Sequence, residues 1–253
     1  MVKTKSMKIS IITATYNSAV HIAACLASVN SQTHKNIEHI IVDGASTDNT
    51  LEIIKATPNR VAKIISEPDK GIYDALNKGI QMASGELIAF LHTDDVFATP
   101  QTIANIVNQF SNEDVSGVYG NLVFVNEHNK VVRTWNSSPF TPSMVKKGWM
   151  PPHPTLVLRK TIYEQYGLFN PSFRIAGDYD FMLRIMQAKD VQLKFIPEII
   201  TKMRMGGAST GSINNIIRKS KEDLKAMKNN GFKHPLLTLL SKNLRKIPQL
   251  FKR

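Results

Sequence analysis

A short apolar run from Leu87 to Leu91 constrains the fold most, because it contains no polar position that could face water. Five consecutive apolar residues are typical of a strand buried on both faces, as in a parallel sheet. Asp94 and Asp95 follow directly. Ligands bind at the carboxyl ends of such strands, where two adjacent carboxylates repel unless a cation or hydrogen-bond donors hold them. The stretch predicts a divalent metal site, with a cap of the helix that begins near Pro100 as the alternative.

The first 95 residues alternate between strand and helix patterns. The predicted strands cover residues 8–13, 37–42, 62–66 and 87–91, and the predicted helices cover 20–29, the stretch after residue 50, and 72–82. This alternation predicts a doubly wound, mostly parallel α/β sheet. Thr15, Asp43, Glu67 and Asp69 all follow strands, so we expect them to gather with Asp94 along one edge.

The pattern changes after a predicted helix over residues 101–110. Strands over 117–125 and 130–135, joined by a polar turn, predict a small antiparallel addition to the sheet. The proline-rich stretch 137–154 is either a mobile loop on the acceptor side or an irregular structural segment. A strand at 155–159, helices at 161–166 and 178–188, and a last short strand at 194–196 complete the expected order.

Composition narrows the class of protein. The chain has 253 residues, a single cysteine and a formal net charge of +12. Cys25 alone excludes a disulfide framework and fits a reducing compartment. No apolar run approaches about 18 residues and the N-terminus does not read as a signal peptide, so we expect a cytoplasmic protein. The first strand is followed by neither a GxGxxG nor a GxxxxGK[ST] motif, which argues against a dinucleotide-binding or P-loop site.

Half of the excess positive charge lies in residues 233–253, which contain six basic residues and no acid. Leucines from Leu236 to Leu244 are interleaved with these bases, which is typical of an amphipathic segment at an anionic membrane surface. The alternative is a helix packed on the rest of the protein with a solvated basic face. Acids rather than bases gather at the predicted site, so nucleic acid is not an expected partner.

Five motifs follow one another along the chain: Thr13-Ala14-Thr15-Tyr16-Asn17, the turn from Asp43 to Thr50, the segment from Ser66 to Gly79, the pair Asp94-Asp95, and Gly177-Asp178-Tyr179-Asp180. In this order they resemble family 2 glycosyltransferases of the GT-A fold, over about Met7 to Gly207. The sequence departs from the pattern of this family at two positions. His92 stands where many members have an aspartate of the metal motif, and Gly177 stands where members commonly have a glutamate.

The resemblance implies an inverting transferase that moves a sugar from a nucleotide-diphosphate donor, usually a UDP-sugar, with Mn²⁺ or Mg²⁺. The acceptor would be a hydroxyl of a saccharide or lipid-linked molecule in surface polysaccharide synthesis, and the enzyme could sit peripherally on the inner membrane face. It implies a catalytic domain over residues 1–210, with a nucleotide-sugar half at 8–95 and an acceptor half at 96–210. Residues 211–253 would form a basic helical extension.

The resemblance also implies site residues. Those for the nucleotide sugar are Thr13, Thr15, Asn17, Asp43, Glu67, Asp69, Lys70, Asn77 and Asp94. Asp95, with Asp94, would hold the metal, and Asp178 would be the catalytic base. Candidates on the acceptor side are Trp149, His153, Asp180 and Arg204.

The chemistry of these residue types is consistent with that reading. A metal ion neutralises charge on a departing diphosphate, and a carboxylate removes the proton of the incoming hydroxyl. Simpler roles remain open, because Asp43 and Asp178 could each cap a helix, and Asp180 could replace Asp178 as base. Alternative functions are a sugar nucleotidyltransferase, for which a glycine-rich basic loop after the first strand is missing, and a basic nucleic-acid-binding protein.

Overall fold

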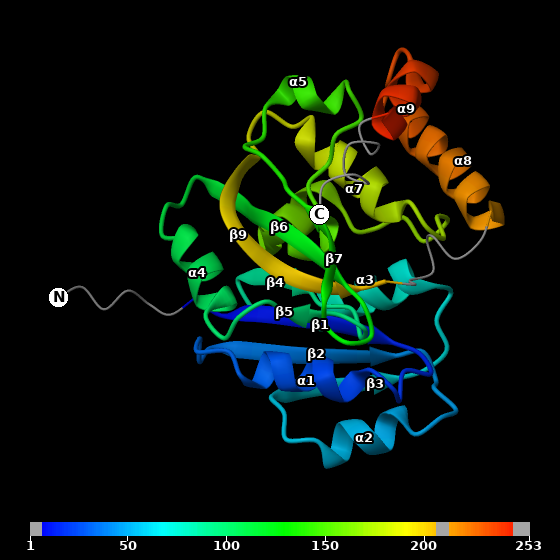
Figure 1. Cartoon of the computed structure of the whole chain (residues 1–253). Helices are drawn as coiled ribbons and strands as arrows, with labels where there is room; N and C mark the ends of the chain where they lie inside the picture. Colours follow the sequence, from blue (N-terminus) through cyan, green and yellow to red (C-terminus); the bar gives the residue numbers. More distant parts are fainter. Residues whose placement is uncertain (1–6, 206–212, 245–253) are drawn as a thin grey trace.

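The computed structural model describes residues 7–205 and 213–244. Its first half alternates strands and helices as predicted (Figure 1). These elements are β1 (Ile9–Thr15), α1 (Ile22–Asn30), β2 (Ile37–Asp43), α2 (Thr50–Ala56), β3 (Val61–Ser66), α3 (Ile72–Met82) and β4 (Leu87–Phe90). The strands pair in parallel in the order β3-β2-β1-β4. All four residues of β4 are buried, which confirms that the apolar run is a central strand.

The second half extends the sheet in a mixed pattern, so that the whole order is β3-β2-β1-β4-β8-β6-β9-β5, with β7 paired to β6. Its elements are β5 (Val96–Phe97), α4 (Thr102–Gln109), β6 (Val115–Val125), β7 (Val131–Trp135), α5 (Pro142–Val145), the 3-10 turn η1 (His153–Thr155), β8 (Val157–Arg159), α6 (Lys160–Tyr166), α7 (Gly177–Met186) and β9 (Gln192–Arg204). The predicted antiparallel addition is present, since β6 and β7 form an antiparallel pair.

The last strand is much longer than predicted. β9 runs over 13 residues and pairs in parallel with β6, whereas the sequence pattern predicted a strand of only residues 194–196. Pro197 lies inside this strand, although proline cannot donate a hydrogen bond to a ladder. In the structure the register shifts between Tyr119 and Asn121, opposite Phe195 and Ile199. The strand therefore continues past the proline through an irregularity in the pairing.

Helices cover both faces of the sheet, as a doubly wound fold requires. One buried cluster joins α3, α6 and α7 to the sheet, and a second joins α1 and α4 to the opposite face. The contact between α3 and β1 is close, because a Cβ atom at Gly79 would lie 2.4 Å from Cγ2 of Ile12. A glycine is needed where the helix backbone approaches the sheet so closely.

The C-terminal helices α8 (Ile213–Asn229) and α9 (Pro235–Leu244) lie against α7 (Figure 1, orange and red). Ala226 and Met227 of α8 belong to the same buried cluster as α7. One side of α9 is also buried, at Thr238 and Lys242. The structure therefore shows the packing of the alternative interpretation, although the opposite side of α9 remains exposed. Within the described residues, no helix has the length and apolar character needed to cross a bilayer.

Candidate active site

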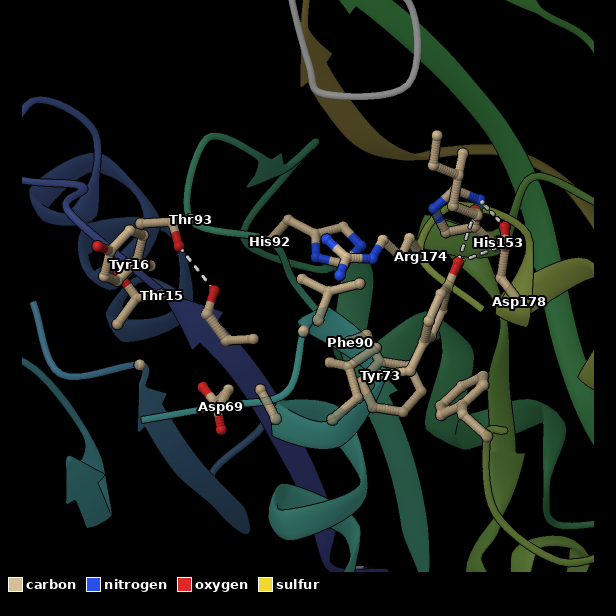
Figure 2. A pocket seen from close by; sticks show the side chains of 18 of the residues that line it. Thr15, Tyr16, Asp69, Tyr73, Phe90, His92, Thr93, His153, Arg174 and Asp178 are labelled. Carbon is tan, nitrogen blue, oxygen red and sulfur yellow. Dashed lines mark hydrogen bonds and ion pairs between the residues drawn. The ribbon is translucent and has the colours of Figure 1, made fainter. Parts of the chain in front are cut away.

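A cavity of about 810 Å³ opens at the carboxyl ends of the parallel strands (Figure 2). Residues from β1, the turn after β2, the start of α3 and the end of β4 line one part of it, and η1 and α7 line the other. Segments as distant in sequence as Thr15 and Asp178 therefore share one space. Five of the predicted site residues lie in its wall: Thr15, Asp69, Asp94, His153 and Asp178.

Thr15 and Tyr16 form one end of the cavity with Gly44. The hydroxyl of Thr15 is buried and has no hydrogen-bond partner among the described residues, so it can bond to a ligand. Tyr16 is 63% exposed although it borders the cavity, which makes its ring available for stacking on a planar ligand group. Sequence reasoning did not select Tyr16, although its place directly after Thr15 was a usable signal.

Three residues predicted to contact the nucleotide lie behind this end of the cavity. Thr13 is fully buried and its hydroxyl lies 3.0 Å from Nε2 of His39. Asn17 accepts a hydrogen bond from the Thr47 amide, and its backbone has a φ of 47°. Asp43 is buried and accepts hydrogen bonds from Ser46 and Ser66. None of the three side chains lines the cavity, and their predicted contacts with the nucleotide stay predictions.

The segment after β3 places a single carboxylate in the cavity. Asp69 lines it, and the Lys78 ammonium lies 2.7 Å from Asp69 and 2.8 Å from Glu67. Hydrogen bonds from Lys78 to the two carboxylates raise the pKa of Lys78. Lys78 therefore holds Asp69 in position, while Glu67 and Lys70 are exposed outside the cavity wall.

Asn77 also has a structural position. Its amide nitrogen donates to the Phe169 carbonyl at 2.8 Å, and its carbonyl oxygen accepts from the Phe169 amide at 3.0 Å. These two bonds attach α3 to the loop before α7. Asn77 does not line the cavity, and its predicted contact with the donor stays a prediction.

The two adjacent aspartates after β4 face different surroundings. Asp94 lines the cavity, whereas Asp95 is fully buried and does not. Neither carboxylate oxygen of Asp95 has a hydrogen-bond partner among the described residues. Burial and the neighbouring charge of Asp94 raise the pKa of Asp95. Of the two aspartates predicted to hold the metal ion, only Asp94 therefore reaches the cavity, and the assignment of the metal ligand stays a prediction.

The described residues contain no group of three or more His, Cys, Asp or Glu side chains arranged to hold a metal ion. A single cavity carboxylate still fits a divalent ion that arrives with phosphate groups, because Mg²⁺ commonly takes one or two carboxylates and fills its other positions with phosphate oxygens and water. Asp94 offers that carboxylate. The residues present therefore fit a metal ion shared with a diphosphate rather than one held by the protein alone.

At the other end of the cavity, Asp178 is held by two partners (Figure 2). Its Oδ2 lies 3.0 Å from Nδ1 of His153, and its Oδ1 accepts a hydrogen bond from the Tyr73 hydroxyl at 3.1 Å. Tyr73 also donates to the Ile175 carbonyl at 2.6 Å. Asp178 thus connects η1, α3 and the first turn of α7 at the cavity wall.

The charges around Asp178 favour its ionised form. Burial alone would raise the pKa of Asp178, but the interaction with His153 and the positive charges of Lys219 and Lys242 outweigh burial and lower it. Nearby His92 behaves differently. Burial, with the charge of His153, lowers the pKa of His92 to about 4, so His92 is neutral near pH 7.

Gly177 allows the contact between Tyr73 and Asp178. A Cβ atom at residue 177 would lie 2.8 Å from two carbons of the Tyr73 ring, closer than real Cβ contacts. The glycine at position 177 is therefore required by the close approach of Tyr73. The Tyr73 hydroxyl lies beside Asp178 as a result.

The remaining acceptor-side candidates do not line the cavity. Trp149 stacks on Phe140 at 5.8 Å between ring centroids, and Asp180 is buried in an ion pair with Arg184. Arg204 ends β9, where Met203 rather than Arg204 reaches the cavity. The sequence analysis missed Arg174, which lines the cavity and forms no ion pair among the described residues (Figure 2). Only its position four residues before Asp178 could have indicated it.

Comparison with known proteins agrees with this geometry. Residues 10–173 match the family model described as Glycosyl transferase family 2. A PGL/p-HBAD biosynthesis glycosyltransferase of Mycobacterium bovis is 28% identical over 208 residues, which cover 81% of this chain and 79% of that protein. An uncharacterized glycosyltransferase of Mycobacterium tuberculosis is 32% identical over 184 residues, which cover 72% of this chain and 70% of that protein.

Solved structures share the fold. S. aureus TarS 1-349 in complex with UDP superposes with a TM-score of 0.70 at 19% identity, covering 96% of this chain and 72% of that chain. The mannosyltransferase PcManGT from Pyrobaculum calidifontis, in complex with GDP-Man and Mn²⁺, gives a TM-score of 0.69 at 18% identity, covering 98% of this chain and 74% of that chain. The mixed sheet with helices on both faces is thus the GT-A fold. By its family match and its relatives, the chain belongs to glycosyl transferase family 2 and is a glycosyltransferase.

Proposed function

We propose that this glycosyltransferase moves a sugar from a nucleotide-diphosphate donor, of the UDP-sugar class, to an acceptor hydroxyl with inversion at the anomeric carbon. One observation carries the proposal. Thr15, Asp69 and Asp94 at the strand ends share a single cavity with Asp178 of α7. The donor and the proton-accepting group can therefore lie on opposite sides of one reacting carbon.

The nucleotide end of the cavity supports a donor with a planar base and a diphosphate. The exposed ring of Tyr16 can stack on a base, and the unpartnered hydroxyl of Thr15 can bond to it or to the ribose. Solved structures of similar fold are complexed with UDP, UDP-GlcNAc and GDP-Man. We favour a uridine nucleotide, and a guanosine nucleotide is the alternative that the same test examines.

Asp94 is the proposed ligand of Mn²⁺ or Mg²⁺. When bound, such an ion neutralises negative charge on the diphosphate and makes it a better leaving group. Asp69, fixed by Lys78, is placed to accept hydrogen bonds from donor hydroxyl groups. Arg174 brings a positive charge into the same cavity, where it can offset charge on the diphosphate or on an acidic acceptor.

Asp178 and its partner His153 mark the end of the cavity at which the acceptor loses its proton. An alcohol is a weak nucleophile at neutral pH and gains reactivity when a base removes its proton during attack. Direct attack from this side, with the diphosphate leaving from the other, inverts the anomeric carbon. The alternative base Asp180 is engaged with Arg184 outside the cavity, so we favour the Asp178 end.

The acceptor is proposed to be a saccharide or a lipid-linked molecule at the inner face of the cell membrane. Four leucine side chains of α9 are each more than 60% exposed: Leu236, Leu237, Leu240 and Leu244. Three lysines near this helix are exposed: Lys233, Lys146 and Lys147. Lys146 lies beside α9, because the Thr238 hydroxyl donates a hydrogen bond to the Lys146 carbonyl. An apolar stripe beside basic residues suits an anionic leaflet. The rest of the basic tail, residues 245–253, lies outside the described residues.

A panel of UDP-, GDP- and dTDP-sugars, incubated with the protein with and without Mn²⁺, tests the proposal. Donor binding should raise the melting temperature, and turnover should release a nucleoside diphosphate with an inverted glycosidic product. A nucleotidyltransferase would instead release pyrophosphate. Absence of both binding and turnover across the panel would contradict the proposed function.

A further inference from the structure

The segment directly before α7 carries part of the cavity wall. Arg174 and Ile175 line the cavity, and Asp178 follows in the first turn of α7. The Ile175 carbonyl and Oδ1 of Asp178 share the hydroxyl of Tyr73, at 2.6 Å and 3.1 Å. The position of the Asp178 carboxylate therefore depends on how the backbone before α7 is held.

Glu222 of α8 holds this backbone. Its Oε2 accepts hydrogen bonds from three successive N–H groups, those of Arg174 at 3.1 Å, Ile175 at 2.8 Å and Ala176 at 2.9 Å. Its Oε1 lies 3.2 Å from the amide nitrogen of Arg174. Hydrogen bonds to a charged acceptor are stronger than neutral ones, and successive N–H groups form a concave site for an anion. One carboxylate therefore fixes the backbone of three residues.

A second side chain of α8 holds the two residues before this site. The Lys225 ammonium donates to the Ser172 hydroxyl at 3.1 Å and lies 4.7 Å from the centroid of the Phe173 ring. Because Lys225 and Glu222 are three residues apart on a helix, they lie on the same side of α8. That side of α8 therefore contacts every residue from 172 to 176.

α8 is itself fixed by buried contacts. Ala226 and Met227 belong to the core cluster that contains α7. Asn230, directly after α8, donates to Oδ1 of Asp180 at 3.1 Å. The Glu222 carboxylate also lies at the N-terminal end of α7, where the helix dipole favours a negative charge. Glu222 is thus a charged group on a rigid support, aimed at the start of the helix that carries Asp178.

We propose that Glu222 is a positioning residue of the transfer reaction, which holds the backbone of residues 174–176 so that Asp178 meets the acceptor in the required geometry. This rests on the proposed function. Glu222 does not line the cavity and acts only through that backbone. Thr15 and Asp94, at the nucleotide end, belong to other elements, so donor binding does not depend on Glu222. The C-terminal helices are then part of the catalytic unit as well as a candidate membrane surface.

Glu222→Ala tests the proposal with the best donor from the panel. The variant should lower kcat by about tenfold to a hundredfold, because a small displacement of a reacting group costs that much in rate. The affinity and stoichiometry of nucleotide binding, measured by titration calorimetry, should be unchanged. Partial unfolding would lower the stoichiometry, so this measurement separates positioning from a loss of folded protein.

Two further variants complete the comparison. Glu222→Gln keeps an amide oxygen that can accept from the N–H groups, so its kcat should lie between those of wild type and Glu222→Ala. Glu164→Ala, at an exposed position on α6 outside the cavity, is the control and should have the kcat of wild type. A Glu222→Ala enzyme with wild-type kcat, or one that loses nucleotide binding in proportion to kcat, would overturn the proposal. If Glu222→Ala does not fold, a wild-type kcat for Glu222→Gln would overturn it.

A second measurement needs no turnover. In hydrogen exchange, the amides of Arg174, Ile175 and Ala176 should exchange slowly in the wild-type protein and faster in Glu222→Gln, with the amides of β1 unchanged. Equal exchange of these three amides in both proteins would refute the contact even if transfer activity is present. Absence of turnover by the wild-type protein with every donor would instead count against the proposed function, and hydrogen exchange would still decide whether Glu222 holds the segment.

Discussion

The ammonium group of Lys242 on α9 lies 2.9 Å from Asp223 on α8, and both side chains are almost completely buried. The same ammonium lies 3.1 Å from the centroid of the Tyr179 ring on α7. One side chain therefore joins three helices. Because Tyr179 follows Asp178, this contact links the C-terminal helices directly to the segment that carries the candidate active-site carboxylate.

Removing one member of this buried pair should destabilise the protein strongly. Lys242→Met should lower the free energy of unfolding by about 3 kcal/mol, because Asp223 would keep a buried charge and, among the described residues, its one remaining ion-pair partner would be Lys219. Urea unfolding measures the loss. Lys221→Met, at an exposed position of the same helix α8, should have little effect. Equal stability of the two variants would show that the pair contributes little.

Replacing the two aspartates after β4 one at a time should have different effects on nucleotide binding. Asp94→Asn should weaken binding of the donor nucleotide in the presence of Mn²⁺ by about tenfold or more, which corresponds to about 1.4 kcal/mol. Asp95→Asn should bind nucleotide nearly as well as wild type, because Asp95 does not line the cavity. Titration calorimetry with and without Mn²⁺ makes the comparison. The reverse order of effects would return the metal to Asp95.

His39 should make stability depend on pH below neutrality. Burial lowers the pKa of His39 to about 3 in the folded protein, whereas the unfolded chain has a value of about 6.5. The unfolded state therefore binds the proton first as pH falls. The contribution of neutral His39 to the free energy of unfolding is fully present above about pH 6.5. As the pH falls toward about 3, this contribution decreases by up to about 1.4 kcal/mol per pH unit.

Replacing His39 by glutamine should flatten this part of the pH profile. Chemical unfolding at a series of pH values between those two limits measures the slope. His128→Gln removes an exposed histidine and should leave the profile unchanged. If the wild-type protein and His39→Gln lose stability in parallel as pH falls, His39 does not control the transition.

The exposed leucines of α9 should govern binding to membranes. Leu236→Asp with Leu240→Asp should weaken sedimentation with vesicles of phosphatidylcholine and phosphatidylglycerol in equal parts, because apolar area is removed and negative charge is added. Both positions are exposed, so the fold should tolerate the change. Val131→Asp, at an exposed position on β7, is the control. Sedimentation that is unaffected by the leucine changes would exclude this surface.

The order of strands and helices up to β4 could be predicted from sequence because the signal is local. Apolar runs and 3.6-residue spacing identified β1, β2, α3 and β4 with small errors at their ends. The extent of β9 could not be predicted in the same way. Its pairing with β6 spans a proline and is decided by contacts between residues 76 to 79 positions apart, which no local pattern encodes.

The sequence by itself determined that acidic and polar side chains follow parallel strands and so gather at one edge of a sheet. Only the tertiary structure decided which of them face the cavity. Asp94 and Asp95 lie in and directly after the turn that follows β4, and only Asp94 faces the cavity while Asp95 is buried. Thr13 and Thr15 lie on the same face of β1, but only Thr15 stands at the end of the strand, so Thr15 lines the cavity while Thr13 packs against His39. The pairing of His153 with Asp178, 25 residues apart in the chain, likewise depends on η1 and α7 being brought together by the fold.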